Sequence, residues 1–266
     1  MMLYKQAFSL GLQKAMRYRA NFFFGMLSFV FPLSIQYFLW TSVFASSDGK
    51  KVFGYTLGQM LAYAVFAAVT SRIVSTGFVS EVNMEIKQGG FAKYLVRPMH
   101  YLPYEGACVL GEKIMNIFFS SILILIISAL LQCYYPGTIS GTGLVLYFLS
   151  MILAILLNYV LYVCFCGAAF WMRDGSGAVF IMTFVGNIVS GGIFPLDIFS
   201  RNVQMVLRSL PFCYTTYFPV SLMNGTISGI EIGKGFLGQV FWIVVMSVLT
   251  NIVWSRGTKK YTAVGG

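Results

Sequence analysis

The sequence predicts an all-α membrane protein with about six transmembrane helices, an N-terminal interfacial helix and a re-entrant helical pair before the last span. This class rests on three observations: 58% of the 266 residues are hydrophobic, only 10% are charged, and the mean hydropathy is +0.78. Soluble domains carry about 25% charged residues, because their surfaces face water. Most of this surface must therefore face lipid, where the backbone has to satisfy its own hydrogen bonds, as it does in a helix.

Six apolar segments are long enough to cross about 30 Å of hydrocarbon, which takes roughly 20 helical residues each. Together they form one transmembrane domain over residues 21–255. We place the spans at about 21–45, 54–78, 114–133, 143–170, 177–195 and 236–255.

Residues 1–20, before the first span, have an amphipathic pattern. Tyr4, Phe8 and Ala15 gather on one face at helical spacing, while polar residues such as Gln13 gather opposite. This pattern is typical of an interfacial helix that lies in the headgroup layer on the cytoplasmic side. A frayed polar tail is the alternative.

The positively charged residues orient the spans, since Lys and Arg resist translocation. With the N-terminus inside, twelve cations fall on the cytoplasmic side and five outside, so both termini and the tail 256–266 are predicted to be cytoplasmic. We expect a plasma membrane location, in a bacterial inner or cytoplasmic membrane. The inner set is Lys5, Lys14, Arg17, Arg19, Lys87, Lys93, Arg97, Lys113, Arg173, Arg256, Lys259 and Lys260. The outer set is Lys50, Lys51, Arg201, Arg208 and Lys234.

The loop 79–113 is the longest cytoplasmic stretch. The Gly89-Gly90 pair interrupts two short helical pieces, and Arg97-Pro98 breaks the chain again after the second piece. The loop also holds four of the eight acidic residues, Glu81, Glu85, Glu105 and Glu112. We expect a soluble partner to dock here, and an inert connector is the alternative.

The outer segment 195–225 behaves differently from the other outer loops. Gly191, Gly192 and Pro195 break the fifth helix near its outer end, since Gly lowers helix stability and Pro removes a donor. A short helix comes next and ends before Pro211. These pieces are too short and too polar to cross, so they suit a re-entrant pair packed within protein.

Catalytic chemistry is absent from the sequence. The nearest approach to a phosphate-cradling loop, residues 228–235, lacks its first glycine and its final hydroxyl, and the single histidine, His100, cannot build a metal cluster. We expect no enzyme activity, no metal and, because the cations lie in short loops, no nucleic-acid partner. The five cysteines show no zinc spacing. A bridge between Cys133 and Cys213 stays open.

The order of these parts resembles the membrane subunit of type-2 ABC transporters, the exporter-type permeases. Residues 86–98, IKQGGFAKYLVRP, look like the inner loop of that family, where a glycine precedes an apolar run and Leu-x-Arg-Pro. Residues 194–199 (FPLDIF), 210–212 (LPF) and 217–219 (YFP) look like its outer re-entrant region. The resemblance covers nearly the whole chain, in architecture more than in motifs.

The resemblance implies an exporter permease with two kinds of partner. A separate ATPase subunit, in two copies, would bind ATP and Mg²⁺ and receive the inner loop as a coupling helix, so no cofactor belongs to this chain. A second permease chain, identical or a sister subunit, would complete the substrate path. The implied coupling residues are Glu81, Glu85, Lys87, Gly89, Gly90, Lys93, Arg97 and Pro98. The implied outer gate is Gly191, Gly192, Pro195 and Pro211.

Four polar side chains fall within spans and are candidates for lining a cavity: Arg72, Asn116, Asn158 and Asn187. Arg72 can also snorkel, or pair with Glu112 or Asp174. For the asparagines, hydrogen bonding between helices is the simpler interpretation. The alternative function is an ATP-independent secondary transporter or channel, although such proteins commonly carry acidic residues deep in their spans.

Overall fold

Helices form every long regular element of the structure, as the sequence predicts. The computed structural model describes residues 2–17, 24, 28, 30–47, 51–75, 77–96, 100–171 and 176–261. Within these residues the β structure consists of one isolated bridge between Val52 and Tyr55. The all-α class is thereby confirmed.

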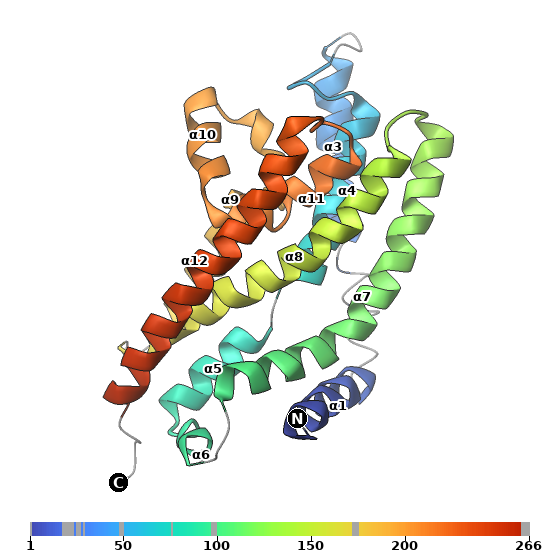
Figure 1. Ribbon diagram of the computed structural model, residues 1–266. Helices are drawn as coiled ribbons and strands as arrows, with labels where there is room; N and C mark the ends of the chain where they lie inside the picture. The colour runs from blue at the N-terminus through green and yellow to red at the C-terminus, as the bar shows by residue number, and fades with distance from the viewer. Residues whose placement is uncertain are drawn as a thin grey trace.

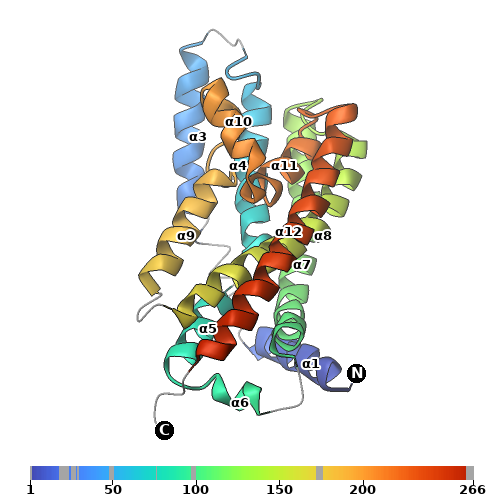
Figure 2. The ribbon, with the colours of Figure 1, turned by 60° about the vertical axis from the view of Figure 1, so that its left-hand side comes forward.

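Among the described residues, four helices are long and apolar enough to cross a membrane (Figure 1). They are α4 (Leu57–Val74), α7 (Tyr101–Tyr134), α8 (Gly141–Cys166), which continues into the 3-10 turn η1 (Gly167–Phe170), and α12 (Ile230–Lys260). Two shorter apolar helices, α3 (Val30–Ala45) and α9 (Ser176–Val189), lie at one edge of the bundle (Figure 2).

Helix α4 is the centre of the bundle, because it is the most buried of the four long helices. Thr56 and Gln59 form a capping box at its start, which satisfies backbone donors there. Tyr63 and Phe66, in its middle, are fully buried in a core that also takes in Tyr147 of α8.

The end of α4 is held by two polar side chains from neighbouring helices. The Lys113 ammonium group of α7 donates to the carbonyl oxygens of Ile73, Val74 and Ser75, at 2.5, 3.0 and 2.6 Å. The Asn158 amide of α8 donates to the Val74 carbonyl at 2.8 Å. The last carbonyls of a helix have no partner within it, so these side chains supply the missing donors.

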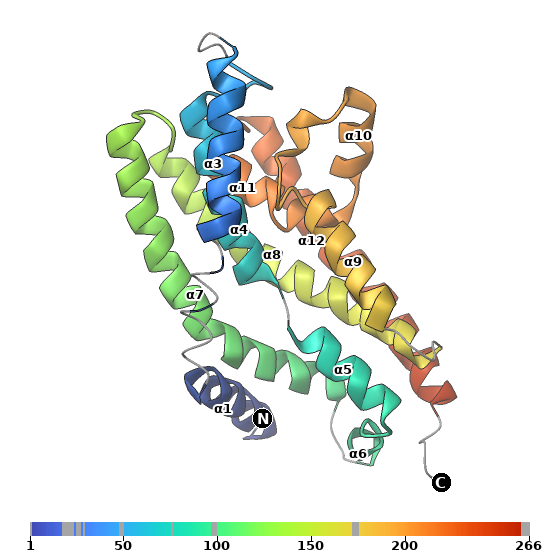
Figure 3. The ribbon, with the colours of Figure 1, turned by 180° about the vertical axis from the view of Figure 1, so that it is seen from behind.

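Helix α1 (Met2–Arg17) lies across one end of the bundle, beneath the first part of α7 (Figures 1 and 3). Two glycines allow the helices to approach closely. A Cβ on Gly11 would stand 2.0 Å from the Cys108 carbonyl oxygen, and one on Gly111 would stand 2.1 Å from that of Phe8. No residue with a side chain fits at either position without moving the helices apart.

The same end of the bundle carries α5 (Phe78–Lys87), α6 (Ala92–Leu95) and the end of α12 (Figure 2). The opposite end carries four short elements. These are η2 (Leu196–Ile198), α10 (Arg201–Ser209), η3 (Pro211–Tyr214) and α11 (Tyr217–Met223). All of α11 is buried, whereas α10 buries none of its residues.

Several helix bounds differ from the expected spans; α9, for example, ends at Val189 and not at residue 195. Helix α7 begins at Tyr101, well before residue 114, and so occupies the last part of the segment expected as the loop 79–113. Helix α12 begins at Ile230, before residue 236. Hydropathy locates the stretch that suits hydrocarbon, but helix geometry continues through charged turns beyond it.

Candidate functional site

The segment from α5 to α6 contains the residues implied in coupling. Gly89 links the two helices with a φ of +78°, the left-handed region that glycine adopts without steric cost. The Phe91 amide then donates to the Glu85 carbonyl at 3.0 Å, which folds the chain back onto α5. A Cβ on Gly90 would make only ordinary contacts, so Gly89 is the residue that the turn requires.

Ion pairs connect this segment to its neighbours. Lys14 of α1 lies 2.9 Å from Glu81 of α5 and 2.8 Å from Glu112 of α7. Lys93 of α6 lies 2.6 Å from Glu85, and this hydrogen bond raises the pKa of Lys93. The three helices α1, α5 and α7 are therefore joined through one ammonium group.

Phe91 anchors the segment in the bundle. Its side chain is 1% exposed and its ring centroid lies 5.0 Å from Tyr101 of α7, 5.5 Å from Phe170 of η1 and 5.9 Å from Trp254 of α12. Tyr94 and Tyr261 complete this group, which we call the Phe91 cluster. Aromatic pairs at such distances are stabilised beyond the area they bury. The Phe91 cluster therefore joins this segment to the start of α7 and to the ends of α8 and α12.

Three of the coupling residues lie wholly or partly outside the described residues. Arg97 and Pro98 are outside, and of Lys87 the backbone alone is described, at the end of α5. The structure brings together the others, Glu81, Glu85, Gly89, Gly90 and Lys93. Lys14 and Phe91 were not predicted as part of this site, because their roles depend on contacts distant in sequence.

The glycine pair that follows α9, Gly191 and Gly192, forms a tight bend. Gly191 has a φ of +77°, and its carbonyl accepts a hydrogen bond of 2.7 Å from the buried Tyr63 hydroxyl of α4. A Cβ on Gly191 would stand 2.7 Å from that hydroxyl, and one on Gly192 would stand 2.7 Å from the Ser71 hydroxyl. Both positions therefore bring the bend directly against α4.

A partly buried carboxylate organises the elements after this bend. The Asp197 carboxylate of η2 accepts from the Tyr55 hydroxyl at 2.6 Å and from the Tyr217 hydroxyl at 3.0 Å, and it lies 2.5 Å from the Arg208 guanidinium. These groups come from the 51–55 turn, from α10 and from α11. We call them the Asp197 network. Asp197 belongs to the motif FPLDIF, but its partners are distant in sequence and no local pattern marks it as a centre of this network.

The two prolines of the implied gate begin 3-10 turns. Pro195 precedes η2 in an extended conformation, and Pro211 is the first residue of η3, where its missing N–H costs nothing. Cys213 lies two residues further on within η3 and is buried, while Cys133 is exposed on α7; both are free thiols.

The candidate cavity residues occupy different environments. The Asn158 side-chain amide forms a hydrogen bond from α8 to the end of α4. The side-chain oxygen of Asn116 is buried and has no hydrogen-bond partner among the described residues. Asn187 has an exposed side chain on α9. Arg72 lies half-buried in the last turn of α4; Glu112, one partner considered for it, pairs with Lys14. Asp174, the other, lies outside the described residues.

The comparison with known families agrees with this architecture. A family model described as ABC-2 family transporter protein matches residues 29–265. The chain therefore belongs to this family and is a multi-pass membrane protein, the permease component of an ABC transporter, which works with an ABC ATPase partner. No curated protein gives a significant match.

Proposed function

We propose that this chain is the membrane subunit of an ABC exporter. With a second permease chain it forms the substrate path, and two copies of a separate ATPase subunit, which bind ATP and Mg²⁺, drive it. The chain itself holds no ATPase site. The observation that carries this proposal is the burial of Phe91, which ties the short helix α6 to three of the membrane helices.

Charge supports an orientation in which this end of the bundle faces the cytoplasm. Lys5, Lys14, Lys93, Arg256 and Lys259 all lie on α1, α6 or the last part of α12, and cytoplasmic segments carry an excess of such cations. In this orientation α3 and α9 complete six spans, and both termini are cytoplasmic. We place the chain in a bacterial cytoplasmic membrane.

The exposed face of α9 supports a second permease chain. Phe180, Ile181 and Phe184 are 71%, 61% and 56% exposed, and Asn187 on the same helix is exposed as well. An unpaired amide in hydrocarbon is costly, so a protein cover suits this face better than lipid. The substrate path would then lie between the two copies of α9.

In the proposed cycle, ATP binding brings the two ATPase subunits together and pushes α5 and α6. The Phe91 cluster transmits this movement to α7, α8 and α12, while Lys14 carries it to α1, which slides along the membrane surface. The Asp197 network holds the re-entrant elements, so the outer gate opens when the helices below it separate. Export is favoured because nothing in the chain suggests docking of an external binding protein.

Photo-cross-linking tests the docking assignment. A benzophenone label on Lys93→Cys, on α6, should capture the ATPase subunit in the assembled complex. The same label on Lys234→Cys is the control. Lys234 is exposed and lies in the first turns of α12, and the start of α12 lies at the other end of the bundle from α6 (Figure 1). Capture of the ATPase subunit from position 234 but not from position 93 would indicate the opposite orientation in the membrane. It would contradict docking of the ATPase at α6.

The competing function is an ATP-independent transporter or channel. Vanadate-sensitive ATP hydrolysis that rises when the ATPase subunit is assembled with this chain in vesicles supports the exporter. Vanadate-insensitive transport by the purified chain alone would support the competitor.

A further inference from the structure

A small hollow at the end of the bundle that carries α5 and α6 is lined by four carboxylates. Its volume is about 190 Å³, and it lies between α1, α5, α6 and α7. Glu81 and Glu85 come from α5, while Glu105 and Glu112 come from the first part of α7. Four of the eight acidic residues of the chain therefore meet at one place. We call this place the acidic hollow.

The acidic hollow holds less positive than negative charge. Lys14 is the only Lys or Arg that lines it within the described part of the chain, and it pairs with Glu81 and Glu112. Lys93 of α6 pairs with Glu85. Two ammonium groups thus face four carboxylates.

Glu105 is the carboxylate that has no counter-charge. It is partly buried and forms no ion pair with any described residue. The charges of the other three carboxylates repel it, and that of Lys14 attracts it. One further cation beside Glu105 would stabilise its ionised form.

A buried hydroxyl in the wall of the acidic hollow also lacks a partner. Tyr101 lines the hollow and is 8% exposed, and its hydroxyl has no hydrogen-bond partner among the described residues. Of the charged groups, Glu105 and Glu85 act on this hydroxyl most strongly. A buried hydroxyl without a partner is costly, and its lone pairs can accept from an N–H donor. No water reaches it in the free chain, so its partner has to come from a group that enters the hollow and shifts the side chains around it.

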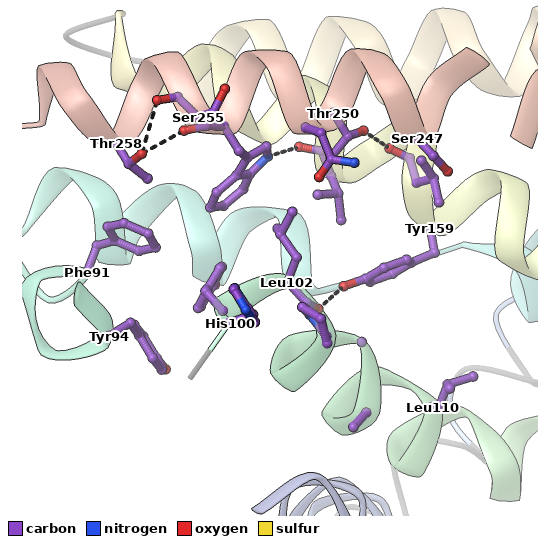
Figure 4. A pocket seen from close by; sticks show the side chains of 18 residues that line it. Phe91, Tyr94, His100, Leu102, Leu110, Tyr159, Ser247, Thr250, Ser255 and Thr258 are labelled. Atoms are coloured by element: carbon purple, nitrogen blue, oxygen red, sulfur yellow. Dashed lines mark hydrogen bonds between the residues drawn. The ribbon is translucent and has the colours of Figure 1, made fainter. Parts of the chain in front are cut away.

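The surroundings direct a cation to the acidic hollow. A larger hollow between the start of α7 and the last part of α12 (Figure 4) has no Asp, Glu, Lys or Arg among its described lining residues. The exposed surfaces of α1 and α12 at this end carry cations, among them Lys5, Arg256 and Lys259. A positively charged group that approaches this end is therefore attracted to the acidic hollow and repelled by its neighbours.

The size and lining of the acidic hollow select the kind of cation. Its volume is below the roughly 300–1,000 Å³ of small-molecule sites, so it suits one side chain. No group of His, Cys, Asp and Glu among the described residues is arranged to hold a metal ion. The rings of Tyr94 and Tyr104 also line the hollow, and a guanidinium group stacks on such rings and presents several N–H donors.

We propose that the acidic hollow receives one arginine side chain of the ATPase subunit. The guanidinium group pairs with the Glu105 carboxylate and donates to the Tyr101 hydroxyl. This contact lies between α5 and α7, beside the pairs of Lys14, so that the bound subunit holds three helices of the permease. The identity of the occupant rests on the proposed function, in which the ATPase subunit docks at α5 and α6.

Binding of the ATPase subunit to the chain in lipid nanodiscs tests the proposal. Glu105→Gln keeps the size of the side chain and breaks no described ion pair, so folding should persist, with the Tm measured alongside. We expect its affinity for the ATPase subunit to fall about tenfold or more, as when one partner of a desolvated charge pair is removed. Tyr101→Phe should lower the affinity roughly two- to tenfold, as expected for one hydrogen bond. The control Glu231→Gln, at the start of α12, should bind like the wild type.

A double-mutant cycle identifies the arginine. Each arginine of the ATPase subunit is replaced by Gln in turn and bound to the wild type and to Glu105→Gln. For one arginine, the loss of affinity measured with the wild type should disappear in Glu105→Gln, because the effects of interacting residues are not additive. Additive losses for every arginine, or wild-type affinity in Glu105→Gln or Tyr101→Phe, would overturn the proposal. Equal binding of the wild type and Glu105→Gln would leave docking at α6 intact, whereas no binding to the wild type would overturn the docking assignment as well.

Discussion

Gly11 of α1 and Gly111 of α7 each lie against the backbone of the other helix. This reciprocal contact fixes α1 against the first part of α7, because a methyl group on either residue would overlap a carbonyl oxygen of the facing helix. Small residues at such positions allow helices to pack at short range. The position of α1 against α7 therefore depends on the absence of a side chain at Gly11 and at Gly111.

Gly11→Ala should loosen this contact. The added Cβ would stand 2.0 Å from the Cys108 carbonyl oxygen, and overpacking of this kind costs about 1–3 kcal/mol. We expect a lower Tm in detergent. Gly233→Ala on α12 meets open space and should be neutral or stabilising by up to about 1 kcal/mol, through helix propensity. Equal Tm values for the two variants would contradict the close contact.

Phe91→Leu should uncouple the permease from its ATPase. The substitution removes the ring that contacts Tyr101, Phe170 and Trp254, each such pair contributing about 0.5–1.5 kcal/mol. We expect ATP hydrolysis stimulated by the permease to fall severalfold while the chain still inserts into the membrane. The control Phe118→Leu changes a ring that is 59% exposed on α7, and it should retain stimulation. Retained stimulation in Phe91→Leu would count against transmission through the cluster.

Asp197→Asn should weaken the end of the bundle that carries η2, α10 and α11. The Arg208 guanidinium loses its carboxylate, and the Tyr55 and Tyr217 hydroxyls lose a charged acceptor. Loss of hydrogen bonds to a charged group costs about 1.5–3 kcal/mol, which a chemical denaturation series can measure. The control is Glu231→Gln, whose pair with Lys234 is 65% exposed and should change stability by less than about 1 kcal/mol. A similar loss in both would show that Asp197 does not organise the region.

Lys113→Met should destabilise the end of α4. The carbonyl oxygens of Ile73 and Ser75 would lose this donor, while that of Val74 would keep the Asn158 amide. We expect a cost of at least about 2 kcal/mol in thermal unfolding. Lys259→Met, which alters an exposed lysine, should stay within about 0.5 kcal/mol of the wild type. If Lys113→Met unfolds at the wild-type temperature, the carbonyl oxygens must find other donors.

The family and the helical class could be predicted from the sequence, because composition and hydropathy report directly on lipid exposure. The motif around Gly89 and the glycine-proline break after α9 were also visible, since glycine and proline restrict the backbone locally. The helix ends were harder to predict from the sequence. In α7, Glu105, Glu112 and Lys113 interrupt the apolar pattern, but the helix continues through them.

The sequence alone determined the membrane setting, the order of the helical parts and the places where the chain must turn, all of which depend on short-range preferences and on the cost of polar groups in lipid. The tertiary structure decided which side chains act together. Phe91 with Trp254, Asp197 with Tyr55 and Lys113 with Ile73 are distant in sequence and meet only after the helices have packed. Partners of this kind leave no local pattern, because packing geometry selects them and residue spacing does not.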